Sequence, residues 1–290
     1  SFKAVFNGES PIKIPLMNYS SSKKSILNGS YNFDEKHGFL FLGLKYESGE
    51  NLFEIRNLAL DNKFNLVSFQ RLGVVTKLND DINNDFIIST NFAKNKIQIK
   101  GRVFDSKFLV KELSKTSKND FLKNISKGIE IDFDKILTDT DFPLKKFRLI
   151  GDIKKGKFEK ISGKSEFIEG KYLDISLKKE KNSNFKILEI HSDVARPLIN
   201  SYKFFDGLNQ GNLIYESRFD DKNSTAILKI SNFKLIKAPA FAKLLTLADF
   251  QGLTDTLKGE GISFDILVIK YTTDSKIMRI QEIFMIGPSI

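Results

Sequence analysis

Short runs in which apolar and polar residues alternate make up most of the sequence, and turn-forming residues separate them. Residues 96–100 (KIQIK) and 172–178 (YLDISLK) are clear examples. A period of two places alternate side chains on opposite faces of a strand, so each run predicts a strand with one apolar face. Gly, Asn and Asp favour tight turns, and they stand between the runs at Asn28-Gly29, Ser48-Gly49, Asp61-Asn62, Asn79-Asp80-Asp81, Lys155-Gly156, Glu169-Gly170 and Asp220-Asp221. The pattern predicts an antiparallel meander of hairpins.

Phenylalanine supplies much of the apolar surface of these strands, since the 290 residues include 27 Phe and no Trp. Hydrophobic residues make up 41% of the chain and charged residues 28%, a composition that excludes global disorder. The length is sufficient to bury a core in one elongated β-rich unit or in two modest domains. No uncharged apolar run approaches the roughly 18 residues that a transmembrane helix needs.

Three segments predict short helices that cover the sheet. Residues 105–114 can be capped by either of their first two residues, and residues 193–205 by Ser192 or Asp193. In residues 239–257 the first position is proline, which suits the first turn of a helix. An apolar stripe then follows at i, i+3, i+4 and i+7, formed by Phe241, Leu244, Leu245 and Ala248.

The segment between Phe233 and Phe264 carries the most specific motif. It contains Ala238-Pro239-Ala240-Phe241-Ala242-Lys243-Leu244-Leu245-Thr246, followed by Gly252-Leu253, Leu257 and Gly259-Glu260-Gly261-Ile262. This arrangement resembles the C-terminal region of AsmA-like proteins, in particular the YhdP-like branch of bacterial envelope proteins. Upstream, residues 210–213 (QGNL) are similar to a G-G-x-L element of that family, with Gln210 where glycine is usual. The similarity covers roughly residues 186–290 and is diffuse before them.

The resemblance implies a mainly β fold of the α+β kind: an extended, curved antiparallel sheet that forms a hydrophobic groove, with a few covering helices. It divides the chain into a β-rich groove segment at residues 1–110, a continuing β-meander at 111–185 and the AsmA-like C-terminal region at 186–290. Because the chain begins with Ser1 and ends at a motif-like Gly287-Pro288-Ser289, we expect it to be a segment of a longer protein.

By the same resemblance, the parent protein would be anchored to the inner membrane through flanks outside these residues and would lie in the periplasm. It would conduct phospholipids between the inner and outer membranes, with acyl chains shielded in the groove and head groups in water. Such transport needs no cofactor. The alternative is a non-catalytic envelope scaffold that binds other envelope proteins and regulates assembly.

Two alternative sets of groove residues lie on the strand that follows the motif. Strict alternation places Phe264, Ile266 and Val268 on one face of that strand, and Leu267 and Ile269 on the other. The sequence does not determine which face is inward. The motif residues themselves are expected to have structural roles, with the glycines at positions that need a positive φ; these residues are Ala238, Pro239, Leu244, Leu245, Gly252, Leu253, Gly259, Glu260 and Gly261.

The net charge of +10 raises the question of nucleic-acid binding. Only seven of the 46 basic residues are arginine, the residue that contacts phosphates and bases in a bidentate manner. The many Lys, Asn, Ile and Phe residues are typical of an AT-rich genome. We therefore expect no nucleic-acid partner, and at most a salt-sensitive attraction to anionic lipid head groups.

The residue types needed for catalysis are scarce. The chain has no Cys and only two histidines, His37 and His191, so neither a nucleophilic triad nor a His- or Cys-based metal site can be assembled. Acidic pairs occur only in turn-like stretches, where Asp bonds to its own backbone. We expect a protein that is not an enzyme and that holds no metal. A glycan-binding protein would need exposed Trp platforms, which the chain lacks.

Overall fold

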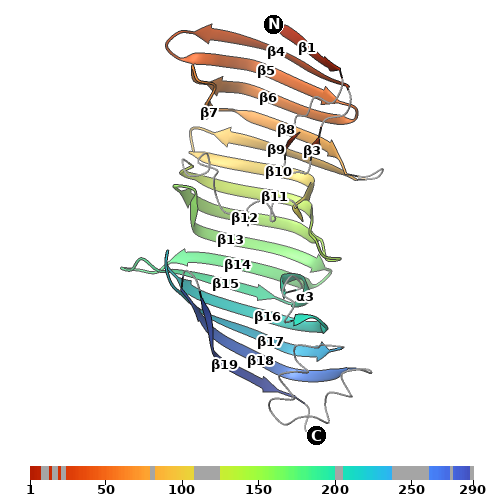
Figure 1. Cartoon of the computed structure of the whole chain (residues 1–290), viewed down its shortest axis with the longest axis vertical. Coiled ribbons are helices and arrows are strands. Elements are labelled where there is room, and N and C mark those ends of the chain that lie inside the picture. The colour runs from red at the N-terminus through yellow and green to blue at the C-terminus, as the bar shows by residue number, and fades with distance from the viewer. Residues whose placement is uncertain are drawn as a thin grey trace. The chain divides into compact units, whose positions relative to one another are not determined.

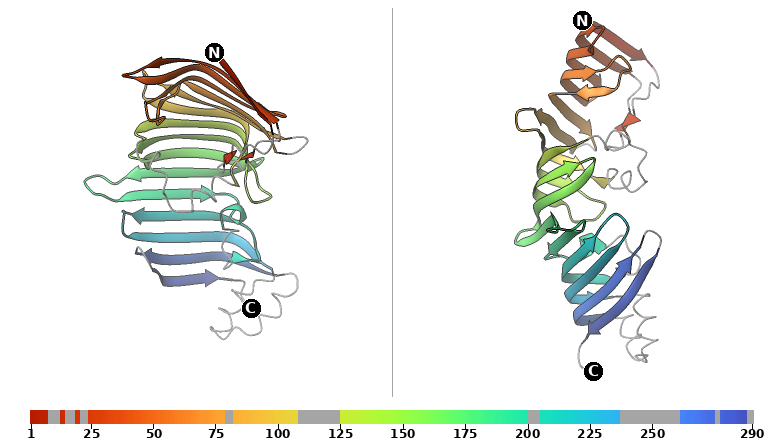
Figure 2. Two further views of the ribbon diagram at one scale, coloured as in Figure 1. Left: turned by 45° about the horizontal axis from the view of Figure 1, so that its top comes forward. Right: turned by 90° about the vertical axis from the view of Figure 1, so that its left-hand side faces the viewer.

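The computed structural model describes residues 1–7, 13–14, 19–20, 24–78, 82–107, 125–199, 205–236, 261–274 and 277–287. These residues are mainly strands, arranged in open, curved sheets of almost entirely antiparallel strands, and α3 (Arg196–Ile199) is the one short helix described among them (Figures 1 and 2). The predicted fold class is therefore confirmed.

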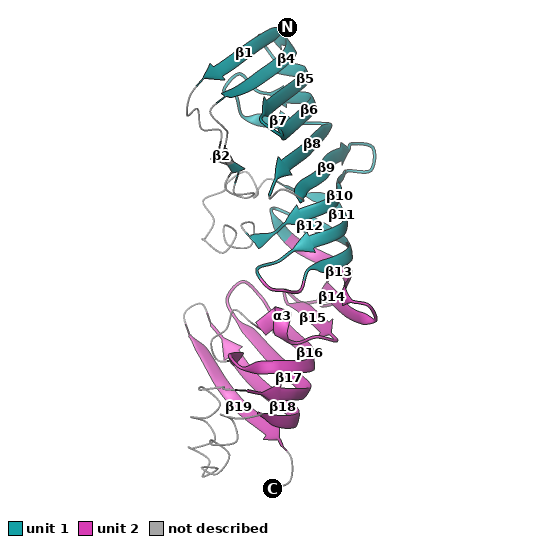
Figure 3. Cartoon of the chain, turned by 90° about the vertical axis from the view of Figure 1, so that its right-hand side faces the viewer, with its two compact units in different colours: residues 1–139, 143–157 teal, residues 140–142, 158–290 magenta. Residues whose placement is uncertain are grey.

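The chain divides into two compact units (Figure 3). Unit 1 consists of residues 1–139 and 143–157, and unit 2 of residues 140–142 and 158–290. The three segments predicted from the sequence were defined by motifs and by the spacing of strands, whereas the two units are defined by compactness. The division does not test the three segments, and they remain a prediction.

Unit 1 contains one large sheet whose strands follow each other in space in the order β1, β4, β5, β6, β8, β9, β10, β11, β12, with short β7 beside the end of β6. A separate two-stranded sheet pairs β2 with β3. The bounds are β1 Phe2–Asn7, β2 Lys13–Ile14, β3 Tyr19–Ser20, β4 Lys24–Asp34, β5 Gly38–Ser48, β6 Asn51–Leu60, β7 Leu66–Ser68, β8 Arg71–Lys77, β9 Asn83–Asn91, β10 Lys96–Asp105, β11 Lys127–Leu137 and β12 Leu144–Lys154.

One pairing in unit 1 departs from the expected meander. β10 and β11 are parallel, with Ile99 opposite Ile131, whereas the other pairs in the sheet are antiparallel. Parallel neighbours cannot be joined by a tight hairpin, and here 21 residues, 106–126, lie between them.

Unit 2 contains an antiparallel sheet in sequence order from β13 to β19. Its elements are β13 Lys157–Ile168, β14 Lys171–Lys179, β15 Lys186–Ser192, α3 Arg196–Ile199, β16 Leu208–Phe219, β17 Ser224–Leu235, β18 Ile262–Thr273 and β19 Met278–Ile286. β13 pairs with β14 and β19 pairs with β18. Among the described residues no pairing joins β13 to β19, so this sheet is open.

Each unit has its own hydrophobic core on one face of its sheet. The core of unit 1 is a set of buried side chains from β3, β5, β6, β8, β9 and β11, namely Tyr19, Tyr46, Phe53, Val74, Phe86, Phe133 and Ile136. The core of unit 2 gathers residues of α3, β16, β17 and β18 with Ala195, namely Ala195, Ile199, Leu208, Leu213, Ile230, Phe233, Leu235, Ile262, Phe264, Leu267 and Ile269.

Left-handed residues inside strands interrupt the period of two. In β17, Ile230 and Phe233 are three residues apart, yet both are buried in the same core, and Asn232 between them has a φ of 54°. A residue with positive φ rotates the following backbone, in the manner of a β-bulge, and brings the next side chain back to the same face. In β12, Lys146, with a φ of 49°, lies likewise between Leu144 and Phe147, which both pack on the core of unit 1.

The two caps predicted for the helix at residues 193–205, Ser192 and Asp193, were wrong. Ser192 is the last residue of β15, and its hydroxyl bonds to Val194, while the carboxylate of Asp193 accepts a bond from the backbone N–H of Tyr172. The helix begins later, at Arg196. A side chain that already has a backbone partner next to a strand is not available to cap a helix.

The other two predicted helices fall mainly on residues that the structure does not describe. Asp105 ends β10 and Ser106 donates its hydroxyl to the carbonyl of Leu137, but residues 108–114 are outside the described ranges. The predicted helix at residues 239–257 lies outside them altogether.

Candidate apolar binding face

A row of aliphatic side chains crosses seven strands of unit 1. Each member is the direct partner of the next across β5, β6, β8, β9, β10, β11 and β12. Directly paired residues project from the same face of a sheet. We call this set the aliphatic row, and it consists of Leu44, Ile55, Leu72, Ile88, Ile99, Ile131 and Leu149.

The aliphatic row is half-buried throughout. On one side it adjoins the buried core, since Ile88 is two residues from Phe86 and Ile131 is two residues from Phe133 on the same face. Each of its side chains therefore keeps part of its apolar surface accessible. A half-buried aliphatic surface of this kind can bind an apolar ligand without opening the core.

The opposite face of the same strands is charged. Lys45 lies directly opposite Glu54, and Asp132 is opposite Arg148, with 2.6 Å between the Asp132 carboxylate and the Arg148 guanidinium. Among the row's sequence neighbours, Ile87 is a half-buried aliphatic residue on that charged face, where it pairs with Lys100. The sheet of unit 1 is thus amphipathic.

An aromatic group extends the apolar face at β1, β4 and β5. Neighbouring rings have centroids 4.8 to 6.5 Å apart, the range of edge-to-face and offset contacts. Phe33 is 54% exposed and Phe64 64% exposed. The sequence analysis did not single out these residues, although a high local density of Phe and Tyr was the available signal; the group is Phe2, Tyr31, Phe33, Phe39, Phe41 and Phe64.

In unit 2 the structure divides one of the two predicted sets of groove residues, Phe264, Ile266 and Val268, and keeps the other, Leu267 and Ile269, together. Phe264, Leu267 and Ile269 are buried in one core, although strict alternation places Phe264 on the other face. Ile266 and Val268 are half-buried and do not belong to that core. The sequence missed the change of face between Phe264 and Leu267.

The backbone irregularity that separates Phe264 from Ile266 and Val268 runs across three strands. Gln210 and Gly211 in β16 have φ values of 61° and 82°, Asn232 in β17 has 54°, and β18 has no paired residue at Asp265, opposite Asn232. This explains the Gln-Gly element that resembles the family's G-G-x-L. A Cβ on Gly211 would lie 2.9 Å from the Cβ of Phe233, so only glycine fits there without displacement.

Most of the motif residues lie outside the part of the chain that the structure describes: Ala238, Pro239, Leu244, Leu245, Gly252, Leu253, Gly259 and Glu260. Gly261 is described, with a φ of 87°, and a Cβ there would lie 2.4 Å from the carbonyl oxygen of Leu235. A positive φ and this close approach both require glycine.

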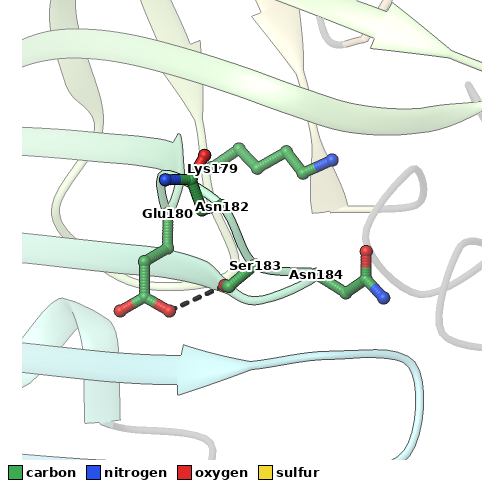
Figure 4. Close-up of a pocket in the computed structure, with 5 residues that line it drawn as sticks. All are labelled: Lys179, Glu180, Asn182, Ser183 and Asn184. Atoms are coloured by element: carbon green, nitrogen blue, oxygen red, sulfur yellow. Dashed lines mark hydrogen bonds between the residues drawn. The ribbon is translucent and has the colours of Figure 1, made fainter.

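A hollow of about 470 Å³ lies at the loop between β14 and β15 (Figure 4). Its carboxylate, Glu180, accepts a bond from Ser183 at 2.7 Å and pairs with Arg218 at 2.8 Å. Arg218 above all holds the pKa of Glu180 below its usual range. Because Glu180 already bonds to Ser183 in its own loop and to Arg218 of β16, it serves to fix the loop and not to receive a ligand.

Neither metal chemistry nor a membrane-spanning helix is found in the described residues. No three His, Asp or Glu side chains gather there in a way that could hold a metal ion. No helix among those residues is long and apolar enough to cross a membrane.

No family model, curated protein or solved structure matches the chain. The resemblance to AsmA-like proteins therefore rests on the residues quoted above.

Proposed function

We propose that this chain is the phospholipid-conducting part of a non-catalytic periplasmic protein whose parent is anchored to the inner membrane. Its apolar face would shield acyl chains between the inner and outer membranes, and the head groups would stay in water. The observation that carries the proposal is the aliphatic row: seven half-buried side chains in one uninterrupted line, on a sheet whose other face is charged.

The dimensions of the aliphatic row suit an acyl chain. Neighbouring strands lie about 4.8 Å apart, so six steps give about 29 Å. The hydrocarbon core of a bilayer, which holds two acyl chains end to end, is about 30 Å thick. One extended chain fits along the row with room to move. Each buried CH₂ contributes about 0.8 kcal/mol, and uniform Leu and Ile contacts favour no single position along the row.

The test compares two adjacent isoleucines of β9 that face opposite ways. Ile88 belongs to the aliphatic row and Ile87 to the charged face, and both are half-buried. We expect gently purified wild-type protein to carry phospholipid in native mass spectrometry. Ile88→Lys should lose most of this lipid, because a charge in the aliphatic row opposes the binding of an acyl chain. Ile87→Lys should keep the lipid.

Circular dichroism of both variants provides the control for folding. Equal lipid loss in two folded variants, or a wild-type protein that stays empty after incubation with liposomes, would contradict the proposal. Lipid extraction from the wild-type sample identifies the cargo.

A second candidate function, the envelope scaffold, is favoured by β19. Ile283 and Phe284 are adjacent, point to opposite faces and are both exposed. Within unit 2, the described residues pair with β19 only through β18, so its other edge can accept a strand. A lipid-free protein that binds an envelope protein through this edge, and loses binding when Phe284 is replaced by proline, would favour the scaffold.

A further inference from the structure

Two arginines on the charged face of unit 1 lie directly opposite each other. Arg56 of β6 pairs with Arg71 of β8 in the antiparallel register, and both side chains are exposed. They project away from the aliphatic row, because their neighbours Ile55 and Leu72 belong to it. Like charges at directly opposed positions destabilise a sheet. An arrangement that costs free energy in the unliganded protein needs a compensating partner or role.

Arg56 and Arg71 also differ from the chain's other arginines. Within the described ranges, neither has an ion-pair partner or a hydrogen-bonded side chain. The remaining five all bond to an oxygen, in the pairs Arg102–Asp85 at 2.7 Å, Arg148–Asp132 at 2.6 Å, Arg196–Asn209 at 3.3 Å, Arg218–Glu180 at 2.8 Å and Arg279–Asp274 at 2.6 Å.

Arg56 and Arg71 both line a hollow of about 450 Å³ whose other lining residues are uncharged. The hollow forms where β7 ends and β8 begins, and a bond of 2.6 Å from Asn57 to the side chain of Gln70 holds that junction. Ser89, directly opposite Arg71, places a hydroxyl beside the pair.

No acidic side chain is among the residues that line this hollow. Glu130, two strands beyond Ser89, pairs with Lys96 and accepts a bond of 2.7 Å from Gln98, and these bonds hold its pKa below the usual range. Glu54, two residues before Arg56, makes no ion pair within 4 Å with either arginine. The hollow is therefore positively charged and open to an anion.

We propose that Arg56 and Arg71 form a binding site for a phosphate group, carried either by a phospholipid head group or by a soluble phosphate compound. Guanidinium groups bind phosphate oxygens in a bidentate manner, and two of them relieve their mutual repulsion by sharing one anion. The Ser89 hydroxyl adds a neutral donor. The site does not depend on lipid conduction, because it is on the face opposite the aliphatic row.

The first experiment titrates inorganic phosphate into the full 290-residue chain and follows the Nε–H signals of the arginines by NMR. We expect saturable shifts for Arg56 and Arg71. Arg56→Gln and Arg71→Gln should each weaken phosphate binding by at least about tenfold, which is about 1.4 kcal/mol. Arg71→Lys keeps the charge but not the bidentate geometry and should weaken it less.

The matched control is Arg148→Gln, which removes an arginine of the same charged face that is already paired with Asp132. Its phosphate affinity should equal that of the wild type. Shifts that rise linearly without saturation, or an affinity loss as large in Arg148→Gln as in Arg71→Gln, would overturn the proposal. Melting temperatures confirm that the variants fold; removing one member of a repulsive pair should not lower them.

The source of the phosphate is determined with vesicles of phosphatidylglycerol. If vesicle binding falls in Arg56→Gln and Arg71→Gln but not in Arg148→Gln, the site takes a lipid head group. If vesicle binding is unchanged while phosphate affinity falls, the site takes a soluble phosphate compound. Either result supports a phosphate site, and both are independent of whether Ile88→Lys loses lipid.

Discussion

A side chain that is fully buried holds a sheet together, whereas a half-buried one still has surface to offer a ligand. Leu267 is 0% exposed in the core of unit 2. A lysine there would place a charge in that core and would test folding, not lipid binding. Ile88 and Ile87 are both half-buried, so a lysine at either position can reach water; because Ile88 also packs against the core of unit 1, the folding control applies above all to Ile88→Lys. The residues best suited to probe lipid binding therefore lie in unit 1, not on β18.

Tyr19 makes the stability of the folded protein depend on pH in the alkaline range. Burial, and then the hydrogen bond to Tyr46, raise the pKa of its phenol from 10.0 to about 12. Its contribution to stability is complete below pH 10 and is lost as the pH rises to about 12, because the unfolded chain releases this proton first. We expect the melting temperature to fall over that interval, and Tyr19→Phe to show a smaller fall.

The control is the same comparison of wild type and Tyr19→Phe below pH 9. There, Tyr19 of the wild-type protein keeps its proton in both the folded and the unfolded state. The two melting temperatures should then run parallel. Identical slopes of melting temperature against pH between pH 10 and 12 would contradict the assignment of this alkaline effect to Tyr19.

At the scale of the strand, the face occupied by a side chain depends on single left-handed residues. Of the eight described non-glycine residues with positive φ, four are asparagine: Asn57, Asn95, Asn182 and Asn232. Asparagine tolerates this conformation better than other residues that have a Cβ. Asn57 and Asn232 lie inside strands, where they change the face of the residues that follow.

Asn232 offers a direct test of this switch. Asn232→Val should lower the free energy of unfolding by about 1–3 kcal/mol, because a β-branched residue is strained at positive φ. Asn232→Gly should stay within about 1 kcal/mol of the wild type, since glycine adopts this φ freely but gains entropy when unfolded. Urea denaturation measures both values.

Asn212 provides the matched control, as an exposed residue at an extended position of β16 that pairs with Ser231, next to Asn232. Asn212→Val should be neutral or slightly stabilising because valine favours strands. If valine lowers the free energy of unfolding by the same amount at both positions, the left-handed conformation is not what constrains Asn232.

These switches mark the limit of what could be predicted from the sequence. Alternation and turn residues were enough to predict that the chain forms strands, because both are local properties of the sequence. The change of face between Phe264 and Leu267 was not predictable by alternation, since it depends on Asn232 in the neighbouring strand and on a β18 position, Asp265, that has no paired partner. Asparagine is also common in ordinary turns, so its presence alone does not reveal a switch within a strand.

At the scale of the molecule, the fold class followed from the sequence, but the candidate site did not. The aliphatic row consists of seven residues from seven strands, and only the strand pairing brings them into line. The parallel pair β10–β11 could not be foreseen, because nothing local distinguishes its strands from those of a hairpin. The Arg56–Arg71 site has the same origin: two residues 15 positions apart become partners only through register.

The central claim, that acyl chains lie along the aliphatic row, is tested most directly by photo-crosslinking. A benzophenone amino acid is placed in turn at each member of three adjacent pairs, and the folded proteins are irradiated with phospholipid vesicles. Each pair joins a residue of the row to its neighbour on the charged face: Ile88 and Ile87, Ile99 and Lys100, Ile131 and Asp132. We predict lipid adducts at Ile88, Ile99 and Ile131 and none above background at their neighbours. Adducts of equal yield at both members of each pair, or adducts only on the charged face, would contradict the account.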